Sequence, residues 1–341
     1  MLLGLALGNS WRHLDGSGQV ESVLTAGVCT QLACFTVEGL IRASVRASHK
    51  GICYPPDVIW HATCRWATIQ GIEPDRLRKL WAFGAWPDGW LVTEPLLSRR
   101  RGSAPATVRA LHTPEARGRP GHAVTFSSGS HAVTRTLPLG AYAVANERAQ
   151  VVELVTDVAA QTHGAPRAQA AAATAALILG RCLAGWPLRE AVAWASHADS
   201  TGRHLVPAKD LGLAAVMAAA DNSPGDVSRL AAFAPDASAV AAPRGGVFAA
   251  ASFPELDQVH ATLDFAARSP VGNSVACVTG ALVGAMHGLS SLPSEILKRL
   301  ELVWIVDALA RDLFLELTDS PDGSEWTEPR DPLWWSRYPG W

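Results

Sequence analysis

Hydrophobic residues recur at three- and four-residue steps through most of the chain, which is the spacing of helices that bury one face. The stretch 30–50 is the clearest case, because apolar residues from Leu32 to Val45 follow this spacing while Arg42 and Arg46 lie on another face. No stretch alternates convincingly at period two, so no sheet of consequence is expected. The pattern therefore predicts an all-α bundle.

Proline and alanine mark the other predicted helices, since proline suits a first helical turn and alanine has the highest helix propensity. The further predicted helices span residues 56–68, 74–83, 149–161, 166–180, 275–288 and 293–314. Breaks rich in glycine and proline are expected at residues 84–89, 113–130, 200–207 and 235–246.

Length and composition favour one large globular unit. The chain has 341 residues, of which 48% are hydrophobic, and it contains no repeat or low-complexity linker long enough to divide it. We therefore expect residues 1–341 to form a single domain. The tail 319–341 carries Trp334, Trp335, Tyr338 and Trp341 among prolines, and we expect this aromatic segment to pack onto the domain.

Net charge and cysteine spacing limit the classes of binding partner and the cellular compartment that we expect. Lys and Arg total 29 against 31 Asp and Glu, a formal net charge of -2, so there is no electrostatic case for nucleic acid or an acidic membrane. The apolar stretches 170–179 and 211–220 fall short of the ~20 residues that span a bilayer. Six cysteines without a paired metal or disulfide spacing indicate reduced thiols. These features predict a soluble, cytoplasmic protein.

Several short motifs occur in a fixed order from about Leu3 to about Leu313. They are the glycine-rich start 3–8, Thr30-Gln31-Leu32 opening a helix, Pro138-Leu139-Gly140, Thr162-His163, and the stretch 280–285. In order and content the chain resembles the ADP-ribosylglycohydrolase family, of the dinitrogenase-reductase-activating glycohydrolase type. The resemblance implies a compact orthogonal multi-helix bundle. It also implies hydrolase ancestry, with two magnesium ions that cleave ADP-ribose from modified targets.

The chain departs from this family where the family carries its metal-binding carboxylates. The family's Gly-Asp falls on Gly8-Asn9, its Thr-Asp-Asp-Thr on residues 27–30, and its Asp-x-Asp-Thr on residues 271–274. Four matched aspartates are replaced by Val28, Cys29, Val271 and Asn273. Magnesium needs near-octahedral oxygen ligation and normally one or two carboxylates. We therefore predict that the ancestral magnesium pair is absent and that no cofactor is bound.

The matched segments define a candidate ligand-binding cleft. Its residues are Asn9, Val28, Cys29, Thr30, Ser130, His131, Arg135, His163, Val271, Asn273 and Ser274. Arg135 matches a family arginine and either contacts a substrate phosphate or forms an internal ion pair. His163 ends a predicted helix, where capping is favoured over catalysis. Asn9, Asn273 and Ser274 either bind ligand or satisfy one another.

Cys29 and His131 are the candidate catalytic residues. Cys29 begins or immediately precedes a helix, and a thiol there can have a lowered pKa and act as a nucleophile. His131 is the base candidate that the motifs place in the cleft, but spacing alone does not bring it beside Cys29. The commoner interpretation of a free cysteine is an inert, buried apolar residue.

Three hypotheses follow from these observations. The leading one is a pseudoenzyme that keeps the fold as a binding module for an ADP-ribose-like group, another small molecule or a protein partner. The second is a metal-independent enzyme that uses Cys29, His131, Asp15 or Glu21 on a different small molecule. The third is residual ADP-ribosyl hydrolysis, which magnesium dependence would separate from the other two.

Overall fold

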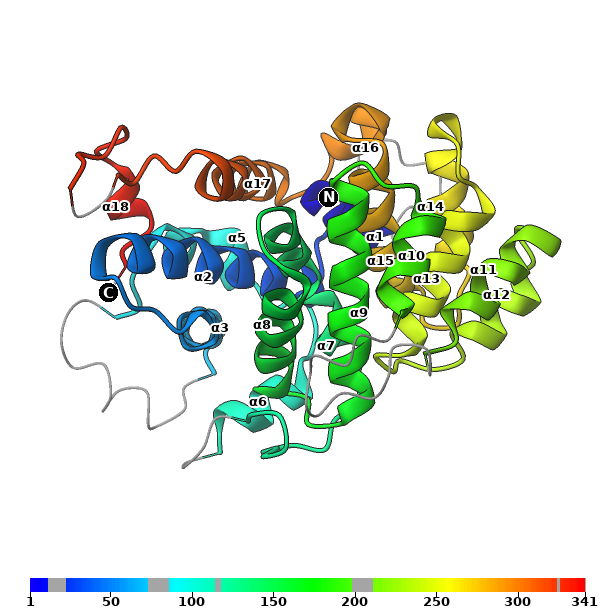
Figure 1. The fold of residues 1–341 in the computed structure, drawn as a ribbon, viewed down its shortest axis with the longest axis horizontal. Coiled ribbons are helices and arrows are strands. Elements are labelled where there is room, and N and C mark those ends of the chain that lie inside the picture. Colours follow the sequence, from blue (N-terminus) through cyan, green and yellow to red (C-terminus); the bar gives the residue numbers. More distant parts are fainter. Residues whose placement is uncertain (12–22, 73–85, 114–117, 198–210, 324–325, 341) are drawn as a thin grey trace.

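The computed structural model describes residues 1–11, 23–72, 86–113, 118–197, 211–323 and 326–340. Helices account for every regular element in these ranges, and the only β pairings there are isolated bridges (Figure 1). The all-α prediction is therefore confirmed for the described part of the chain. The predicted helix 74–83, the predicted break 200–207, and the candidates Asp15 and Glu21 lie outside it.

The predicted helices 30–50, 56–68, 149–161, 166–180 and 275–288 are present, and many shorter helices were not predicted. The α-helices are α1 (Leu2–Ser10), α2 (Val28–Lys50), α3 (Pro55–Ile69), α5 (Pro95–Ser98), α6 (Pro105–Leu111), α7 (His131–Thr134), α8 (Arg148–Ala160), α9 (Pro166–Leu183), α10 (Leu188–Ser196), α11 (Leu213–Asn222), α12 (Val227–Phe233), α13 (Ala241–Ser252), α14 (Val259–Ala267), α15 (Gly272–Met286), α16 (Ser294–Leu297), α17 (Val303–Thr318) and α18 (Trp334–Arg337). Short 3-10 turns connect them: η2 (Trp90–Thr93), η3 (Leu137–Val144), η5 (Leu256–Gln258) and η6 (Leu289–Ser291).

Helix α1 packs directly on α15, so segments about 270 residues apart in the sequence lie side by side in the middle of the molecule (Figure 1). The helices approach so closely that a Cβ added at Gly4 would lie 2.0 Å from the carbonyl oxygen of Gly280. One added at Gly8 would lie 1.9 Å from the carbonyl oxygen of Ala276. Glycine is therefore needed at the contact. The glycine-rich start of the chain is a helix with all nine residues buried.

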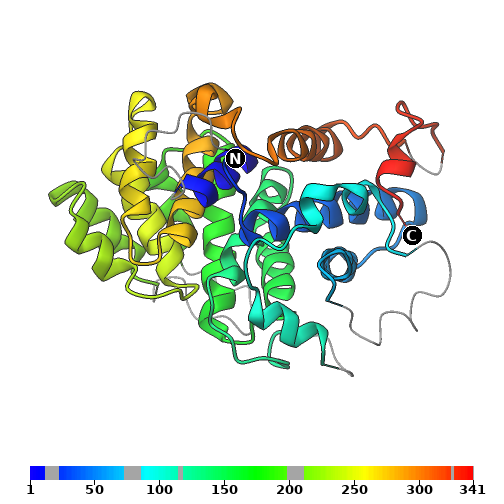
Figure 2. The same ribbon diagram turned by 180° about the vertical axis from the view of Figure 1, so that it is seen from behind.

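Helix α2 is the longest element, and it lies between α3 and α17. By length and composition it could cross a bilayer, but 94% of its most apolar window is buried inside the fold. Its Gly51 C-cap adopts φ 64°, the left-handed conformation that favours glycine at a helix end. From behind, α5 is seen to run along α2, and the C-terminal segment reaches the far end of α2 (Figure 2).

The predicted helix 293–314 is wrong in one respect, because it is divided into α16 and α17. Between them the chain pairs with Leu24 as a parallel bridge. The Leu24 N–H donates to the Arg299 carbonyl at 2.7 Å, and the Glu301 N–H donates to the Leu24 carbonyl at 3.0 Å. These two hydrogen bonds replace helical ones and end α16.

The predicted break 235–246 is also shorter than expected, since α13 begins at Ala241. Pro243 lies in the first turn, where the missing N–H costs no helical hydrogen bond. Gly245 and Gly246 face α15, where an added Cβ would lie 2.8 Å from the Val275 side chain and 2.5 Å from that of Val278, respectively. Both glycines therefore serve close packing of α13 on α15 rather than a turn.

The C-terminal segment after α17 lies against α2 and α17. Trp334 and Tyr338 are buried, and the Tyr338 hydroxyl donates to Asp312 Oδ2 at 2.5 Å. The Trp334 indole donates to Glu316 Oε2 at 3.0 Å. Trp326 on the same segment is exposed. The described residues of this aromatic tail thus contact the helical body through specific polar groups as well as ring packing.

Candidate functional site

The first turn of α2 is capped by a residue from α1. Its N-cap, Gly27, has no side chain, and Asn9 at the end of α1 takes the role: Asn9 Oδ1 accepts from the Thr30 N–H at 3.3 Å and from the Thr30 hydroxyl at 2.9 Å. A Cβ at Gly27 would lie 2.8 Å from that oxygen. Asn9 and Thr30, both candidate cleft residues, are therefore used to join two helices.

Val28 and Cys29 form the first turn of α2, and both are buried, at 8% and 6% exposure. The Val28 N–H donates to the Arg101 carbonyl at 3.2 Å, and the Val28 side chain lies against Gly102. An ion pair between Arg101 and Glu301, at 2.6 Å, holds this loop in place. Two positions that the family fills with carboxylates are thus packed under a loop.

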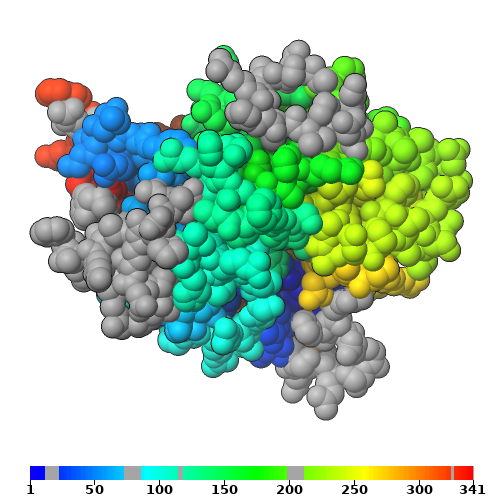
Figure 3. Space-filling model, turned by 90° about the horizontal axis from the view of Figure 1, so that it is seen from below, coloured from blue at the N-terminus to red at the C-terminus, as the bar shows by residue number. Residues whose placement is uncertain are grey.

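The loop belongs to a stretch, from η2 to α7, that spreads over the middle of one face of the molecule (Figure 3). Gln31 Nε2 fastens this stretch by donating to the Arg99 carbonyl at 2.9 Å and to the Leu97 carbonyl at 3.3 Å. On the other side of Gly102 the loop borders a pocket of about 450 Å³, lined also by Trp66, Gln70, Arg100 and Arg109.

His131 begins α7 and lies close enough to Cys29 for the charges of the two side chains to interact. The strand-like pairing before it fixes its place, since the Ser130 N–H donates to the Ala237 carbonyl at 2.8 Å and the Ala239 N–H donates to the Ser128 carbonyl at 2.7 Å. The structure therefore brings together the two candidate catalytic residues, which lie about 100 positions apart in the sequence.

The Cys29–His131 contact changes the pKa of both groups. Burial alone would raise the pKa of the Cys29 thiol, but the charge and hydrogen bond of His131, aided by the Thr134 hydroxyl, hold it below its ordinary value. Burial would lower the pKa of His131, and the Cys29 charge instead raises it. Each shift has the direction that a nearby opposite charge produces.

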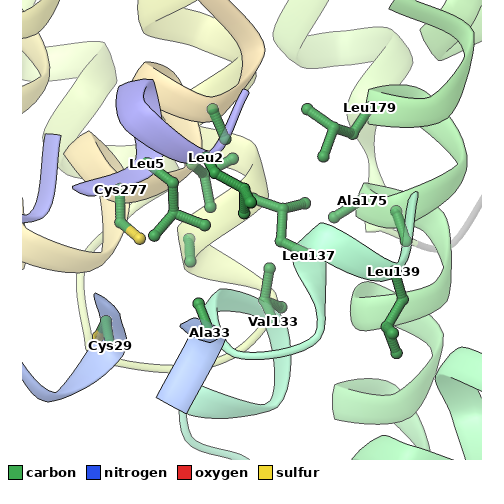
Figure 4. Close-up of a cluster of buried hydrophobic side chains, with 14 of the residues drawn as sticks. Leu2, Leu5, Cys29, Ala33, Val133, Leu137, Leu139, Ala175, Leu179 and Cys277 are labelled. Carbon is green, nitrogen blue, oxygen red and sulfur yellow. The ribbon is translucent and has the colours of Figure 1, made fainter. Parts of the chain in front are cut away.

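Cys277 on α15 lies close enough to Cys29 for their charges to interact (Figure 4). Its side chain points from α15 toward the turn of α2 that carries Cys29, with Leu5 of α1 beside it (Figure 4). Burial and the neighbouring Cys29 charge raise the pKa of Cys277 well above its ordinary value. Sequence reasoning missed Cys277 because it sits in an apolar helix with no motif around it.

Arg135 and His163 form a second polar group behind His131. Arg135 is fully buried, and its Nη2 donates to the Val158 carbonyl at 2.5 Å and the Thr162 hydroxyl at 2.7 Å. Thr162 Oγ1 lies 2.8 Å from His163 Nδ1. Because Arg135 can only donate, the Thr162 hydrogen is free to point at Nδ1, which assigns the neutral Nε2–H tautomer to His163.

These contacts show how Arg135 and His163 are bound inside the fold. Arg135 forms no ion pair within the described residues; it binds the carbonyl end of α8, where a cation is favourable. Burial, followed by the charges of Arg135 and His131, holds the pKa of His163 well below its ordinary value. The His163 side chain is bonded to the Thr162 hydroxyl, while Arg135 binds the carbonyls at the end of α8.

The start of α15 does not close onto Asn9 in the way the sequence allowed. The Ser274 hydroxyl donates to the Val271 carbonyl at 3.1 Å, inside its own turn. Asn273 is exposed and Val271 is half-buried. Asn273 therefore faces outward, and the Ser274 hydroxyl is used inside its own turn.

The magnesium pair of the family does not fit the residues present. Val28 and Val271 offer no ligand atom, Cys29 is paired with His131, and Asn9 Oδ1 accepts the two Thr30 hydrogens. Across the described ranges no group of three or more His, Cys, Asp or Glu is placed to hold a metal ion. A hard cation would meet no carboxylate at the matched positions.

Comparison with known proteins places the chain in a family. It matches the family model for ADP-ribosylglycohydrolase over residues 15–322, and it therefore belongs to that family. A solved structure titled "ADP-ribosylglycohydrolase-related protein complex" is similar, with 19% sequence identity and a TM-score of 0.49. The alignment covers 84% of this chain and 98% of that one. No curated protein matches the sequence.

Proposed function

We propose that this protein is an ADP-ribosylglycohydrolase family member that has given up two-magnesium hydrolysis and acts as a binding module. The observation that carries the proposal is the first turn of α2, where buried Val28 and Cys29 stand at the carboxylate positions. The nearest amide oxygen, on Asn9, is committed to capping that turn. Family membership supplies the hydrolase ancestry.

The proposed ligand is an ADP-ribose-like group or another small molecule, or a protein partner, bound over the ancestral cleft. His131 is half-buried and Asn273 is exposed, so these two can reach a ligand without rearrangement. Arg135 cannot, because it is fully buried and its Nη2 already bonds Val158 and Thr162. Neither nucleic acid nor a membrane is proposed as a partner, and a cytoplasmic location remains an expectation.

Calorimetry and turnover assays test the binding-module proposal together. Titration with magnesium should give no specific heat, and ADP-ribosyl-arginine and ADP-ribosyl-serine substrates should survive incubation with the metal. Titration with ADP-ribose should give saturable heat that Asn273→Ala weakens. Magnesium-dependent turnover at about one per second or faster, typical of enzymes, would overturn the proposal.

The contact between Cys29 and His131 favours a second candidate function, a metal-independent enzyme acting on a different small molecule. A nucleophile with a lowered pKa beside a base is the arrangement of covalent catalysis. A substrate screen with Cys29→Ala and Cys34→Ala decides between the candidates. Both cysteines lie buried on α2, so activity lost in the first variant and kept in the second supports catalysis by Cys29.

A further inference from the structure

Helix α17 carries large apolar side chains that the fold does not bury. Its inner side packs on α2 and α1, and both ribbon views place it along the edge of the molecule (Figure 1 and Figure 2). On its other side Trp304 is 49% exposed, Phe314 66% and Leu315 40%. Single exposed apolar residues are ordinary on a protein surface, but a group of them on one helix indicates an interaction site.

These side chains share one strip of the helix, which we call the α17 outer face. At about 100° per residue the strip spans an arc of about 100°. Its members are Trp304, Asp307, Arg311, Phe314, Leu315 and Thr318. The strip runs along most of a helix of 16 residues, which is about 24 Å long. Trp90 of η2 extends it at one end, since the ring centroids of Trp90 and Trp304 lie 6.0 Å apart.

Two charged residues lie in the middle of the α17 outer face. Arg311 Nε lies 2.8 Å from Asp307 Oδ2, and the two side chains are 69% and 35% exposed. The pair has no net charge. A guanidinium presents five N–H groups in a planar fork, so Arg311 can bind a second carboxylate while it keeps the first.

The α17 outer face matches itself when it is turned end to end. Trp304 and Phe314 lie five residues on either side of Leu309, and Asp307 and Arg311 lie two residues on either side of it. A twofold axis at the level of Leu309 exchanges the two ends of the face and also its two edges. The members of each pair lie toward opposite edges of the strip. The axis therefore sets each residue against its counterpart in a second copy.

We infer that α17 is the interface of a symmetric dimer, in which the α17 outer faces of two copies pack antiparallel. Each Trp304 ring then packs on the partner's Phe314, and each Arg311 binds its own Asp307 and the partner's Asp307. Two arginines and two aspartates form a closed network, so burial leaves none of these charges unpaired. The formal net charge of -2 gives little repulsion between the copies.

The order of the residues favours a second copy over a different protein. Aromatic residues and arginine are enriched at protein interfaces of every kind. A surface that binds a different protein, however, gains nothing from an arrangement in which Trp304 matches Phe314 and Asp307 matches Arg311 about one point. The inference goes beyond the proposed function, because the α17 outer face shares no residue with the candidate ligand-binding cleft.

The size of the face limits the strength of the dimer. A standard interface buries about 800 Å² on each partner, and one helix face supplies less. We therefore expect a reversible dimer with a Kd of about 10 to 100 µM.

Sedimentation velocity of the full chain, at concentrations from well below to well above that Kd, tests the inference. Arg311→Asp sets carboxylates against each other at the contact and should weaken dimerisation at least tenfold. Asp307→Arg should do the same, because it sets guanidinium groups against each other. An equal mixture of the two variants should associate as wild type does, since every contact between the copies then joins an arginine to an aspartate.

Lys298→Glu is the matched control, because Lys298 forms a similarly exposed ion pair with Glu295, at 2.7 Å, away from the α17 outer face. It should leave the Kd unchanged. Phe314→Ser keeps the charges and should weaken dimerisation at least tenfold, through the loss of apolar contact. Circular dichroism checks the fold of each variant.

Three results would overturn the inference. They are a wild-type monomer at every concentration, which would assign the face to a different protein, a dimer that survives Arg311→Asp, and a mixture of the two charge variants that stays monomeric. Calorimetry with ADP-ribose on Arg311→Asp separates this inference from the proposed function, because the substitution leaves the cleft intact.

Discussion

Asn9 caps helix α2 from the end of α1, because its Oδ1 accepts both the backbone N–H and the hydroxyl of Thr30. A side chain that accepts from the third N–H of a helix usually sits on the N-cap residue itself. Here the N-cap is Gly27, and the oxygen arrives from another helix. Asn9, which is matched to the aspartate of the family's Gly-Asp motif, is therefore a structural link between α1 and α2 in this chain.

Replacing Asn9 should destabilise the protein through this cap. We expect Asn9→Ala to lower the free energy of unfolding by about 1 to 2 kcal/mol, since the Thr30 N–H and hydroxyl lose a buried acceptor. Asn9→Asp keeps the acceptor and adds a charge that suits a helix N-terminus, so it should fall within about 0.5 kcal/mol of wild type. Urea unfolding measures both. Equal losses in the two variants would contradict the capping role.

Restoring the four carboxylates should destabilise the protein without metal. The variant Val28→Asp, Cys29→Asp, Val271→Asp, Asn273→Asp places two carboxylates in the buried first turn of α2, where neither is solvated. Magnesium should recover part of the loss by binding only the folded state. Thermal unfolding with and without magnesium is the measurement.

Asn273→Asp alone is the matched control for the quadruple variant, because Asn273 is exposed and a charge there stays hydrated. We expect it to unfold within a degree or two of wild type, with or without magnesium. If the quadruple variant is as stable as wild type and indifferent to the metal, then the matched segments do not form one site.

Glu316 should make the docking of the C-terminal segment depend on pH. Ser320 Oγ lies 2.8 Å from Glu316 Oε2 and 2.6 Å from Asp322 Oδ1, yet a hydroxyl has only one hydrogen to donate. The Ser320 hydroxyl can therefore donate to only one of the two buried carboxyl groups at a time. Burial raises the pKa of Glu316 to about 7, with Asp322 adding to the effect and with Ser44, Ser320 and Trp334 opposing it.

The sign follows from the direction of that shift. A carboxyl whose folded pKa lies above its unfolded value stabilises the fold at low pH, and this contribution is lost as pH rises through about 7. Glu316→Gln stays neutral, so its stability relative to wild type should grow by up to about 3 kcal/mol from pH 5 to pH 8. Glu295→Gln on the exposed surface of α16 is the control, and the comparison fails if both variants track wild type.

The glycines between α1 and α15 should be among the least replaceable residues. A Cβ at Gly280 would lie 2.0 Å from the Gly4 carbonyl oxygen, so Gly280→Ala must push two backbones apart and should cost more than about 3 kcal/mol. At Gly284 the nearest atom is 3.0 Å away, on Met1, so Gly284→Ala should cost less. Chemical denaturation of the two variants tests this order, and a reversed order would show that α1 can shift along α15.

Helical periodicity, together with proline and alanine, located the long helices α2, α3, α8 and α9, because one buried face leaves a repeating pattern in the sequence. It could not reveal the interruption between α16 and α17, which depends on hydrogen bonds from Leu24, about 275 residues away. Nor could it show that Gly245 and Gly246 pack against α15 inside a helix. Glycine and proline signal a turn or a close contact equally well, and only the tertiary structure distinguishes them.

The sequence predicted which residues belong to the candidate site, but not which of them contact one another. The motifs selected Cys29 and His131, but their contact depends on how α7 is held by residues 237–239. Asn273 was selected by its position in a motif and faces outward. Cys277 carries no motif at all, so no sequence signal pointed to it. Spacing indicates which residues belong to a site, whereas contacts between distant helices decide what each one does.

The packing of α1 against α15 also affects when the protein can finish folding during translation. The nine buried residues of α1 leave the ribosome before their partner α15, which follows about 270 residues later; at 5–20 residues per second this interval is roughly 15 to 50 s. During that interval the apolar α1 segment of the nascent chain lacks the helix against which it packs. The last steps of folding must therefore wait for translation of α15, and chaperones that shield short apolar segments can protect α1 until then.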